Sequence, residues 1–431
     1  MEVIGIFILV ISFVTLLAIG VPIAWSIGIS SLITILISID SLPAFTTIAQ
    51  RMGTSLDSFT LLAIPFFVLA GQLMNRGGIA KRLINFAKNM MGSLPGGLAY
   101  VNVVAAMLFG AVAGSAMAAA TAVGSILGPR MVDEGYDREF GAAVNITSST
   151  TGLLIPPSNV LIIYSLASGG ASIAALFLAG YIPGILTGLL LMAVAAIWAK
   201  KKGYPTGERV SLRALGASFI KAIPSLLLLI IVIGGIIAGI FTATEASAVA
   251  VLYTLILGFI YKELNIQELP SVFLEAVKTT AIVLLLIATS IAMSWVMSFE
   301  NIPQSVSATL LGLSDNPIII LLMINFILLF VGTFMDMTPA VLIFTPIFLP
   351  IVQDMGIDPV HFGIIMILNL CIGLCTPPVG SVLFVGASVA KTTIEKLVWP
   401  LLPLFLAMIV ALILVTLFPQ LSLWLPGLFG F

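Results

Sequence analysis

The sequence predicts an all-α polytopic membrane protein made of two inverted repeats, each with one re-entrant helical hairpin and one broken transmembrane helix. Three observations predict this fold class. Of the 431 residues, 60% are hydrophobic and only 8% are charged, whereas about a quarter of the residues in a soluble domain are charged. Apolar segments of about 20 residues, the length that crosses a hydrocarbon core, recur along the chain. These segments are interrupted at corresponding places in the two halves.

Composition and motifs exclude several classes of function. The net charge of −1 provides no basic surface for nucleic acid. The sequence has no phosphate-binding loop and no H-E-x-x-H motif, and we expect its single histidine, His361, to lie in solvent at a loop end. Cys371 and Cys375 are too few for a disulfide framework or a zinc cluster, so we expect them to pack in the core. A soluble enzyme and an ATP-driven pump are therefore excluded for this chain.

The first half divides into apolar segments that predict its helices. The chain opens with Met1 and Glu2 and no basic region, so its first apolar segment is predicted to be a membrane helix and not a cleaved signal peptide. A segment at 83–91 with flanking basic residues is predicted to lie in the membrane interface. The other predicted helices are 3–19, 23–39, 59–74, 96–131 (interrupted at 110–115), 141–166 (interrupted at 148–152 and 155–159) and 182–199.

The second half follows in the same order. Its predicted segments are 226–241, 246–261, 279–297, an interfacial piece at 302–313, 318–350 (interrupted at 332–339), 362–390 (interrupted at 375–380) and 401–418. One offset of 221 residues relates Pro129 to Pro350, Gly135 to Gly356, Asp137 to Asp358, Gly152 to Gly373, and Pro156-Pro157 to Pro377-Pro378. Matching interruptions of this kind are typical of an internally duplicated transporter.

The basic residues predict the orientation. If each half has five full crossings and one hairpin that enters and leaves on one side, the second half is inverted, because five is odd. If the basic stretch at 200–213 is placed in the cytoplasm, 16 of the 17 Lys and Arg residues fall on the cytoplasmic side, and Arg51 is the exception. The first hairpin then opens to the cytoplasm and the second to the outside, and both chain termini are predicted to be periplasmic.

The interruptions are the candidate site. Non-helical backbone at membrane depth leaves N–H and C=O groups unpaired, and it is tolerated only where protein, water or ions satisfy them. Carbonyl and hydroxyl oxygens suit Na⁺, and half-helix N-termini suit a carboxylate. We therefore expect two facing groups of polar atoms that bind a cation and an organic anion. Their members are Gly114, Ser115, Gly152, Ser158 and Asn159 in the first repeat, and Gly332, Thr333, Asp336, Thr338, Gly373, Thr376 and Val379 in the second.

Some of these residues have a simpler explanation. Small residues also permit close helix packing, which is the interpretation we favour for the Ala-rich run at 116–122. Asn159 after a double proline needs polar partners at such depth, and an intramembrane carboxylate such as Asp336 is a functional candidate. Glu245 is either a charge that stabilises a helix N-terminus or a functional residue, and the sequence leaves both alternatives open.

The stretches at 110–115, 129–136, 155–159, 242–246, 332–339 and 376–380 jointly resemble the large membrane subunit of the TRAP (tripartite ATP-independent periplasmic) transporters, over essentially the whole chain. The resemblance implies an elevator-type transporter of the ion-transporter superfamily, in which a mobile transport domain slides against a scaffold. It implies a Na⁺ gradient as the driving force and a bacterial or archaeal inner membrane. It also implies a smaller membrane subunit, a periplasmic solute-binding protein, and an organic acid substrate such as a C4-dicarboxylate or sialic acid.

The resemblance also suggests roles for single residues. In the family one Na⁺ site lies at the second hairpin and the following break, and the repeat offset places an equivalent site in the first repeat. The predicted sodium ligands are Gly332, Thr333, Gly373, Thr376 and Val379 in the second repeat, and Ala111, Ser115, Gly152 and Ser158 in the first. The predicted substrate contacts are Ser158, Asn159, Asp336, Thr338 and Pro377. No transition metal is expected.

The expected domains follow the repeats. Scaffold helices are expected at 1–75 and 216–299, and the transport domain, made of an interfacial arm, a hairpin and a broken helix from each repeat, at 76–168 and 300–390. A linking helix with a basic loop is expected at 169–215, and a C-terminal helix at 391–431. Two alternatives stay open. The chain could be a self-sufficient Na⁺/dicarboxylate-type symporter of the same superfamily. It could instead be a non-transporting membrane scaffold or an intramembrane enzyme, which would have no need of four matched interruptions.

Overall fold

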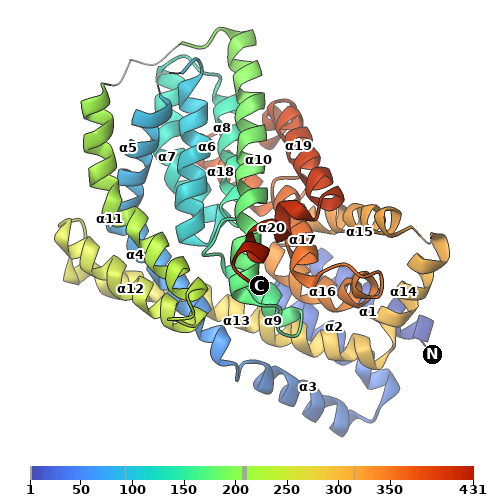
Figure 1. Cartoon of the computed structure of the whole chain (residues 1–431). Coiled ribbons are helices and arrows are strands. Elements are labelled where there is room, and N and C mark those ends of the chain that lie inside the picture. The colour runs from blue at the N-terminus through green and yellow to red at the C-terminus, as the bar shows by residue number, and fades with distance from the viewer. Residues whose placement is uncertain (1, 93, 206–210, 315) are drawn as a thin grey trace.

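The computed structural model of the chain describes residues 2–92, 94–205, 211–314 and 316–431, which fold into α-helices joined by short connections (Figure 1). Within these residues, seven helical segments are long and apolar enough to cross a membrane: Phe59–Arg76, Ile173–Lys202, Leu212–Ile237, Ala243–Ile260, Ile266–Phe299, Met337–Asp354 and Ile394–Leu417. The predicted class of all-α multi-pass membrane protein is confirmed.

The first repeat runs from α1 to α10. Its helices are α1 (Glu2–Ala18), α2 (Ile23–Ser38), α3 (Ser41–Ser55), the 3₁₀ turn η1 (Phe59–Leu62), α4 (Ala63–Arg76), α5 (Ile79–Met91), α6 (Gly97–Ala113), α7 (Ala116–Asp133), α8 (Arg138–Thr151), α9 (Asn159–Ala167) and α10 (Ile173–Lys202). The hairpin is α6 and α7, and the broken helix is α8 and α9.

The second repeat runs from α11 to α20. Its helices are α11 (Leu212–Ile237), α12 (Ala243–Ile260), the 3₁₀ turn η2 (Ile266–Glu268), α13 (Leu269–Phe299), α14 (Ile302–Leu313), α15 (Pro317–Gly332), α16 (Met337–Asp354), α17 (Pro359–Leu374), α18 (Ser381–Ala390), α19 (Ile394–Leu417) and α20 (Gln420–Leu428). Here the hairpin is α15 and α16, and the broken helix is α17 and α18.

The hairpins and broken helices interlock. Both helices of each hairpin pack against the first half of the broken helix in their own repeat, α6 and α7 on α8, and α15 and α16 on α17. Each second hairpin helix also packs across the repeats, α7 against α18 and α16 against α9. The two breaks are therefore held next to both hairpins. The long helices α10 and α19 lie against this bundle, since α10 contacts α6, α8 and α17, and α19 contacts α8 and α17.

The remaining long helices flank the bundle. Helix α4 packs against α12 and α13, while α13 also contacts α2, α3 and α16 and runs beneath α9 and α16 in Figure 1. Glu300, just after α13, is buried, and its carboxylate accepts a hydrogen bond from the Ser38 hydroxyl of α2. Which of these helices move and which stay fixed remains a prediction.

Several sequence-based expectations need correction. Helices α3 and α20 were not predicted, because α3 carries polar residues and α20 follows the last apolar segment directly. The polar stretch at 148–151 is helical and belongs to α8. His361 is not solvated: it is 2% exposed, near the start of α17. Glu245 forms a capping box with Thr242 at the start of α12, so its role there is to stabilise a helix N-terminus.

Candidate functional site

The first nest, as we call the hairpin tip at 110–115 with the break at 152–159, is held together by close backbone contact. A methyl group added at Gly152 would lie 2.4 Å from the Cα of Gly110 and 2.9 Å from the backbone nitrogen of Ala111. Gly114 ends α6 with a φ of 59°, a left-handed conformation that glycine adopts without strain. The hairpin and the break therefore meet backbone to backbone, as predicted for Ala111 and Gly152.

Two polar side chains of the first nest have atoms without a partner. Ser158 and Asn159 begin α9, and both are buried. The Ser158 hydroxyl and the Asn159 carbonyl oxygen form no hydrogen bond with the protein. Asn159 lies beside the hairpin tip, because a methyl group at Gly114 would be 2.9 Å from its side-chain nitrogen. Buried oxygens of this kind normally have a partner, so an ion, a water molecule or a bound ligand is expected to pair with them.

The second nest consists of the hairpin tip at 332–336 and the break at 373–380. A methyl group added at Gly373 would lie 2.6 Å from the Cα of Gly332. The Val379 N–H donates to the Thr333 carbonyl oxygen at 3.1 Å, which ties the break directly to the tip. The Thr376 hydroxyl donates to the Ile372 carbonyl oxygen at 2.7 Å. The hairpin tip and the break that carry the five sodium candidates of this repeat therefore lie side by side, with Gly332 against Gly373 and Thr333 against Val379.

A cavity of about 430 Å³ lies between the nests and the flanking helices. Gly114, Ser115, Asn159, Asp336 and Thr338 line it, so residues from both repeats meet there as predicted. Ser158 and Pro377, which were also predicted to contact substrate, do not line it. Ser158 is instead fully buried behind Asn159 in the first nest.

Four helices begin at this cavity. Its lining includes the first residues of α7, α9, α16 and α18, which are Ala116, Asn159, Met337 and Ser381. The backbone N–H groups at a helix N-terminus have no partner within the helix, and the helix dipole places partial positive charge there. Four such ends directed at one space favour an anion. The Ser381 hydroxyl donates to the Asp336 carboxylate at 3.2 Å, which joins the starts of α16 and α18.

The flanking helices supply cavity residues that sequence reasoning missed. Gln72 and Asn75 of α4 and Thr279 of α13 also line the cavity. A signal was present in the sequence, because Gln72 and Asn75 are isolated polar residues three apart in an apolar helix and so share one face. Within the described ranges, no group of three or more His, Cys, Asp or Glu side chains is placed to hold a metal ion.

Two of the basic residues predicted to be cytoplasmic, Lys202 and Lys391, lie near the start of α8. Lys202 at the end of α10 forms an ion pair with Asp137 at 3.1 Å, and the Tyr204 hydroxyl donates to the same carboxylate at 2.9 Å. Burial by itself raises the pKa of Asp137, but the hydrogen bonds from Lys202 and Tyr204 outweigh it, so this pKa lies below its ordinary value. Thr392, beside Lys391, donates to Glu139 at 3.4 Å.

Known proteins with similar sequences and folds agree with this architecture. The family model described as "Tripartite ATP-independent periplasmic transporter, DctM component" matches residues 10–421. An uncharacterized Salmonella typhimurium protein, YgiK, is 58% identical over 97% of this chain and 96% of its own length. The C4-dicarboxylate TRAP transporter large permease protein DctM of Pseudomonas aeruginosa is 44% identical over 94% of both chains.

A third relative is longer than this chain. The isethionate TRAP transporter permease protein DctMQ of Oleidesulfovibrio alaskensis is 43% identical over 96% of this chain and 65% of its own length. Among solved structures, the YdaH transporter of Alcanivorax borkumensis superposes with a TM-score of 0.63 at 14% identity, over 90% of this chain and 89% of that one, and so shares the fold. The chain belongs to the DctM component family of the tripartite ATP-independent periplasmic transporters, a family of membrane permeases and not of enzymes.

Proposed function

We propose that this chain is the large membrane subunit of a Na⁺-driven TRAP transporter that imports an organic acid, such as a C4-dicarboxylate or sialic acid, by an elevator mechanism. One observation carries the proposal: four helix N-termini, two from each repeat, begin at a single cavity of about 430 Å³. A carboxylate is the small organic group that this arrangement suits best.

The two nests fit Na⁺. This ion takes oxygen ligands, and both nests gather backbone carbonyl and hydroxyl oxygens around a pair of glycines that no side chain could replace without collision. The first nest adds a buried Ser158 hydroxyl without a partner. Na⁺ bound in the nests would supply positive charge beside the cavity. The chain's own part is to hold the hairpin tips against the breaks, so that the four N-termini converge.

Coupling would follow from the order of binding. A ligand shifts a conformational equilibrium only by its different affinities for the two states. Because each nest joins a hairpin to a break, an ordered nest fixes the cavity wall, and the carboxylate would bind better to that state. The bundle of α6 to α9 and α15 to α18, with α10 and α19 against it, would then slide past α4, α12 and α13.

The partners and the orientation are part of the same proposal. A periplasmic solute-binding protein would deliver the acid, and a small membrane subunit would accompany this chain in the inner membrane. The longer DctMQ relative is consistent with a large and a small subunit joined in one chain. The distribution of basic residues supports a periplasmic position for both termini.

Uptake by proteoliposomes tests the proposal. The chain is reconstituted with its small subunit and binding protein, and accumulation of succinate, isethionate and N-acetylneuraminate is followed with and without a Na⁺ gradient. We expect accumulation of one of these acids only with the gradient. Equal uptake in both conditions would remove Na⁺ as the driver, and uptake by this chain without its partners would favour the self-sufficient symporter.

A further inference from the structure

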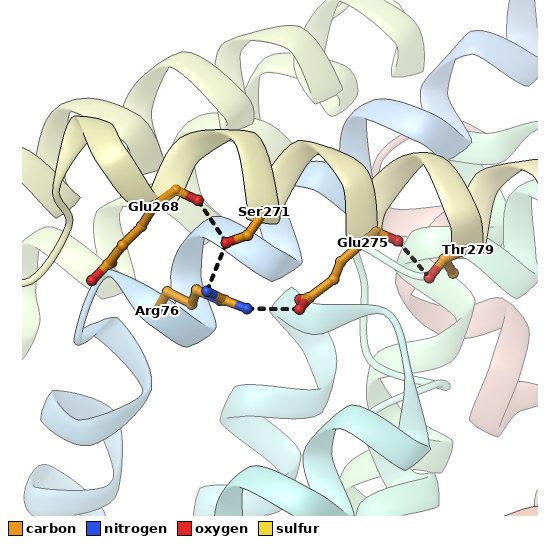
Figure 2. Close-up of polar contacts among 5 residues, drawn as sticks. All are labelled: Arg76, Glu268, Ser271, Glu275 and Thr279. Atoms are coloured by element: carbon orange, nitrogen blue, oxygen red, sulfur yellow. Dashed lines mark hydrogen bonds and ion pairs between the residues drawn. The ribbon is translucent and has the colours of Figure 1, made fainter.

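An ion pair joins α4 and α13 at one end of the cavity. Figure 2 shows Arg76, the last residue of α4, reaching across to α13. Its guanidinium donates to the Glu275 carboxylate at 2.7 Å and to the Ser271 hydroxyl at 3.0 Å. The arginine and glutamate side chains are 35% and 47% exposed, so another molecule can reach both of them.

The pair continues the cavity wall by one helical turn. On α4, Val68 and Gln72 line the cavity, and Arg76 is the next residue at the same spacing of four. On α13, Val283 and Thr279 line it, and Glu275 is again four residues further. Residues four apart lie one above another on a helix. Arg76 and Glu275 therefore lie on the faces of α4 and α13 that line the cavity, at the end of α4 that is predicted to be cytoplasmic.

The charges around the cavity make this position significant. Asp336 is the only charged residue in the cavity lining of the described chain, and it is negative. The anionic ligand is then held by dipoles and by bound cations, with no basic side chain in the lining. Arg76 is a cation one helical turn beyond the lining residue Gln72. A guanidinium has five N–H donors in a planar fork, which matches a carboxylate.

We propose that Arg76 is a second anion-recognition point, which receives the substrate carboxylate at the cytoplasmic end of the cavity in exchange for Glu275. This inference rests on the proposed function. Glu275 competes with the substrate for the guanidinium, so it keeps the acid from being held too tightly as it leaves. The exchange costs little, because the pair that opens is partly exposed and ion pairs in contact with solvent contribute little to stability.

Two variants with opposite expected effects test the exchange. Substrate counterflow is measured in proteoliposomes that contain the full three-part system, with whichever of succinate, isethionate and N-acetylneuraminate the wild type carries. Arg76→Gln is expected to raise the half-saturating concentration on the cytoplasmic side about tenfold, because a charge-assisted hydrogen bond is lost. Glu275→Gln is expected to lower it severalfold and to slow release. Arg76→Lys, which keeps the charge but not the fork, should fall between Arg76→Gln and the wild type.

A matched control separates recognition from structure. Arg130 pairs with Glu134 at 3.2 Å, with similar exposure and away from the cavity lining, and Arg130→Gln should leave all half-saturating concentrations unchanged. If the pair only ties α4 to α13, Arg76→Gln and Glu275→Gln will change transport and thermal stability in the same direction. That result, or no effect of either, overturns the exchange while wild-type transport stands. A wild type that carries none of the three acids overturns the proposed function and this inference with it.

Discussion

At the first hairpin tip Ser115 begins the turn into α7, whereas Asp336 occupies the corresponding position 221 residues later and begins α16. The neutral hydroxyl of Ser115 accepts a hydrogen bond from the Ala118 N–H at 3.3 Å. The Asp336 carboxylate is instead turned toward Ser381 of α18. Two copies of one backbone design thus carry different charges at the same cavity.

The breaks differ in a complementary way. Ser158 in the first nest corresponds to Val379 in the second. The Val379 N–H is paired with the Thr333 carbonyl oxygen, whereas the Ser158 hydroxyl has no protein partner. In the second nest a backbone hydrogen bond thus joins the break to the tip, and in the first a buried hydroxyl has no protein partner. The comparison indicates that the two repeats share the glycine contacts and differ in the polar groups around them.

The largest effect is expected from the close contact between two glycines that occurs in each nest. Gly152→Val and Gly373→Val place a side chain within 2.4 and 2.6 Å of the opposite glycine, and overpacking of this kind costs about 1–3 kcal/mol. We expect both variants to lose at least about tenfold in uptake rate. Gly234→Ala is the control, since a methyl group there has no neighbour within 4 Å. Full activity of either valine variant would contradict the close contact in that nest.

The carboxylate of the second nest is expected to have the next largest effect. The Asp336 side chain makes no capping hydrogen bond, and Asn has nearly the same size as Asp, so Asp336→Asn removes charge with little change in shape. We expect a loss of about tenfold in Na⁺-driven uptake, on the scale of one charged interaction, and unchanged thermal stability. Asp336→Ser makes the second tip resemble the first, and it should be at least as impaired. Uptake at the wild-type rate by both variants would exclude a functional role for this charge.

The unpaired hydroxyl of the first nest should affect Na⁺ more than stability. Ser158 makes no capping hydrogen bond with its side chain, so Ser158→Ala should leave the melting temperature unchanged. The Na⁺ concentration for half-maximal uptake should rise about fivefold, because one oxygen ligand worth about 1 kcal/mol is lost. Ser172→Ala is the control: it removes the capping bond to the Ala175 N–H at the start of α10, away from the cavity lining, and should lower stability by about 1 kcal/mol without changing the Na⁺ requirement. An unchanged Na⁺ requirement in Ser158→Ala would exclude its hydroxyl as a ligand.

The smallest effect is expected where the two repeats enter their broken helices. Asp358 caps α17 by accepting from the Val360 N–H at 2.7 Å, whereas Asp137 pairs with Lys202 and Tyr204. Because the pKa of Asp137 is lowered in the folded protein, its contribution is present above the unfolded value of about 3.9 and is lost as the pH falls through the folded value.

Thermal unfolding of Asp137→Asn checks this sign. At pH 7 the variant should be less stable than the wild type by under about 1 kcal/mol, since the pair is half exposed. The two proteins should converge as the pH falls below about 4. Asp133→Asn, at an exposed position nearby, provides the control with no expected shift. A difference that persists at low pH would assign the effect to packing and not to charge.

The offset of 221 residues between the repeats was the main source of the correct predictions about the broken helices. It matched α8 to α17 and each break to its partner, because the double prolines Pro156-Pro157 and Pro377-Pro378 interrupt a helix through local backbone geometry and so can be read without tertiary information. Single prolines such as Pro129 and Pro350 carry no such signal, since they lie inside α7 and α16. Sequence periodicity failed at α3, whose mixed polar face resembles a loop, and at 148–151, where hydroxyl side chains bond to carbonyls of their own helix. His361 was misplaced because a lone histidine carries no signal of burial.

Hydrophobicity and the spacing of helix-breaking residues by themselves determined the membrane class, the two repeats and the residues at their interruptions, since these depend on transfer to lipid and on local backbone geometry. Only the tertiary structure decided that α7 packs on α18 and α16 on α9, and that Gln72, Asn75, Thr279 and Arg76 lie at or beside the cavity. Contacts between segments distant in sequence depend on how helices pack against one another, and no local pattern encodes that arrangement.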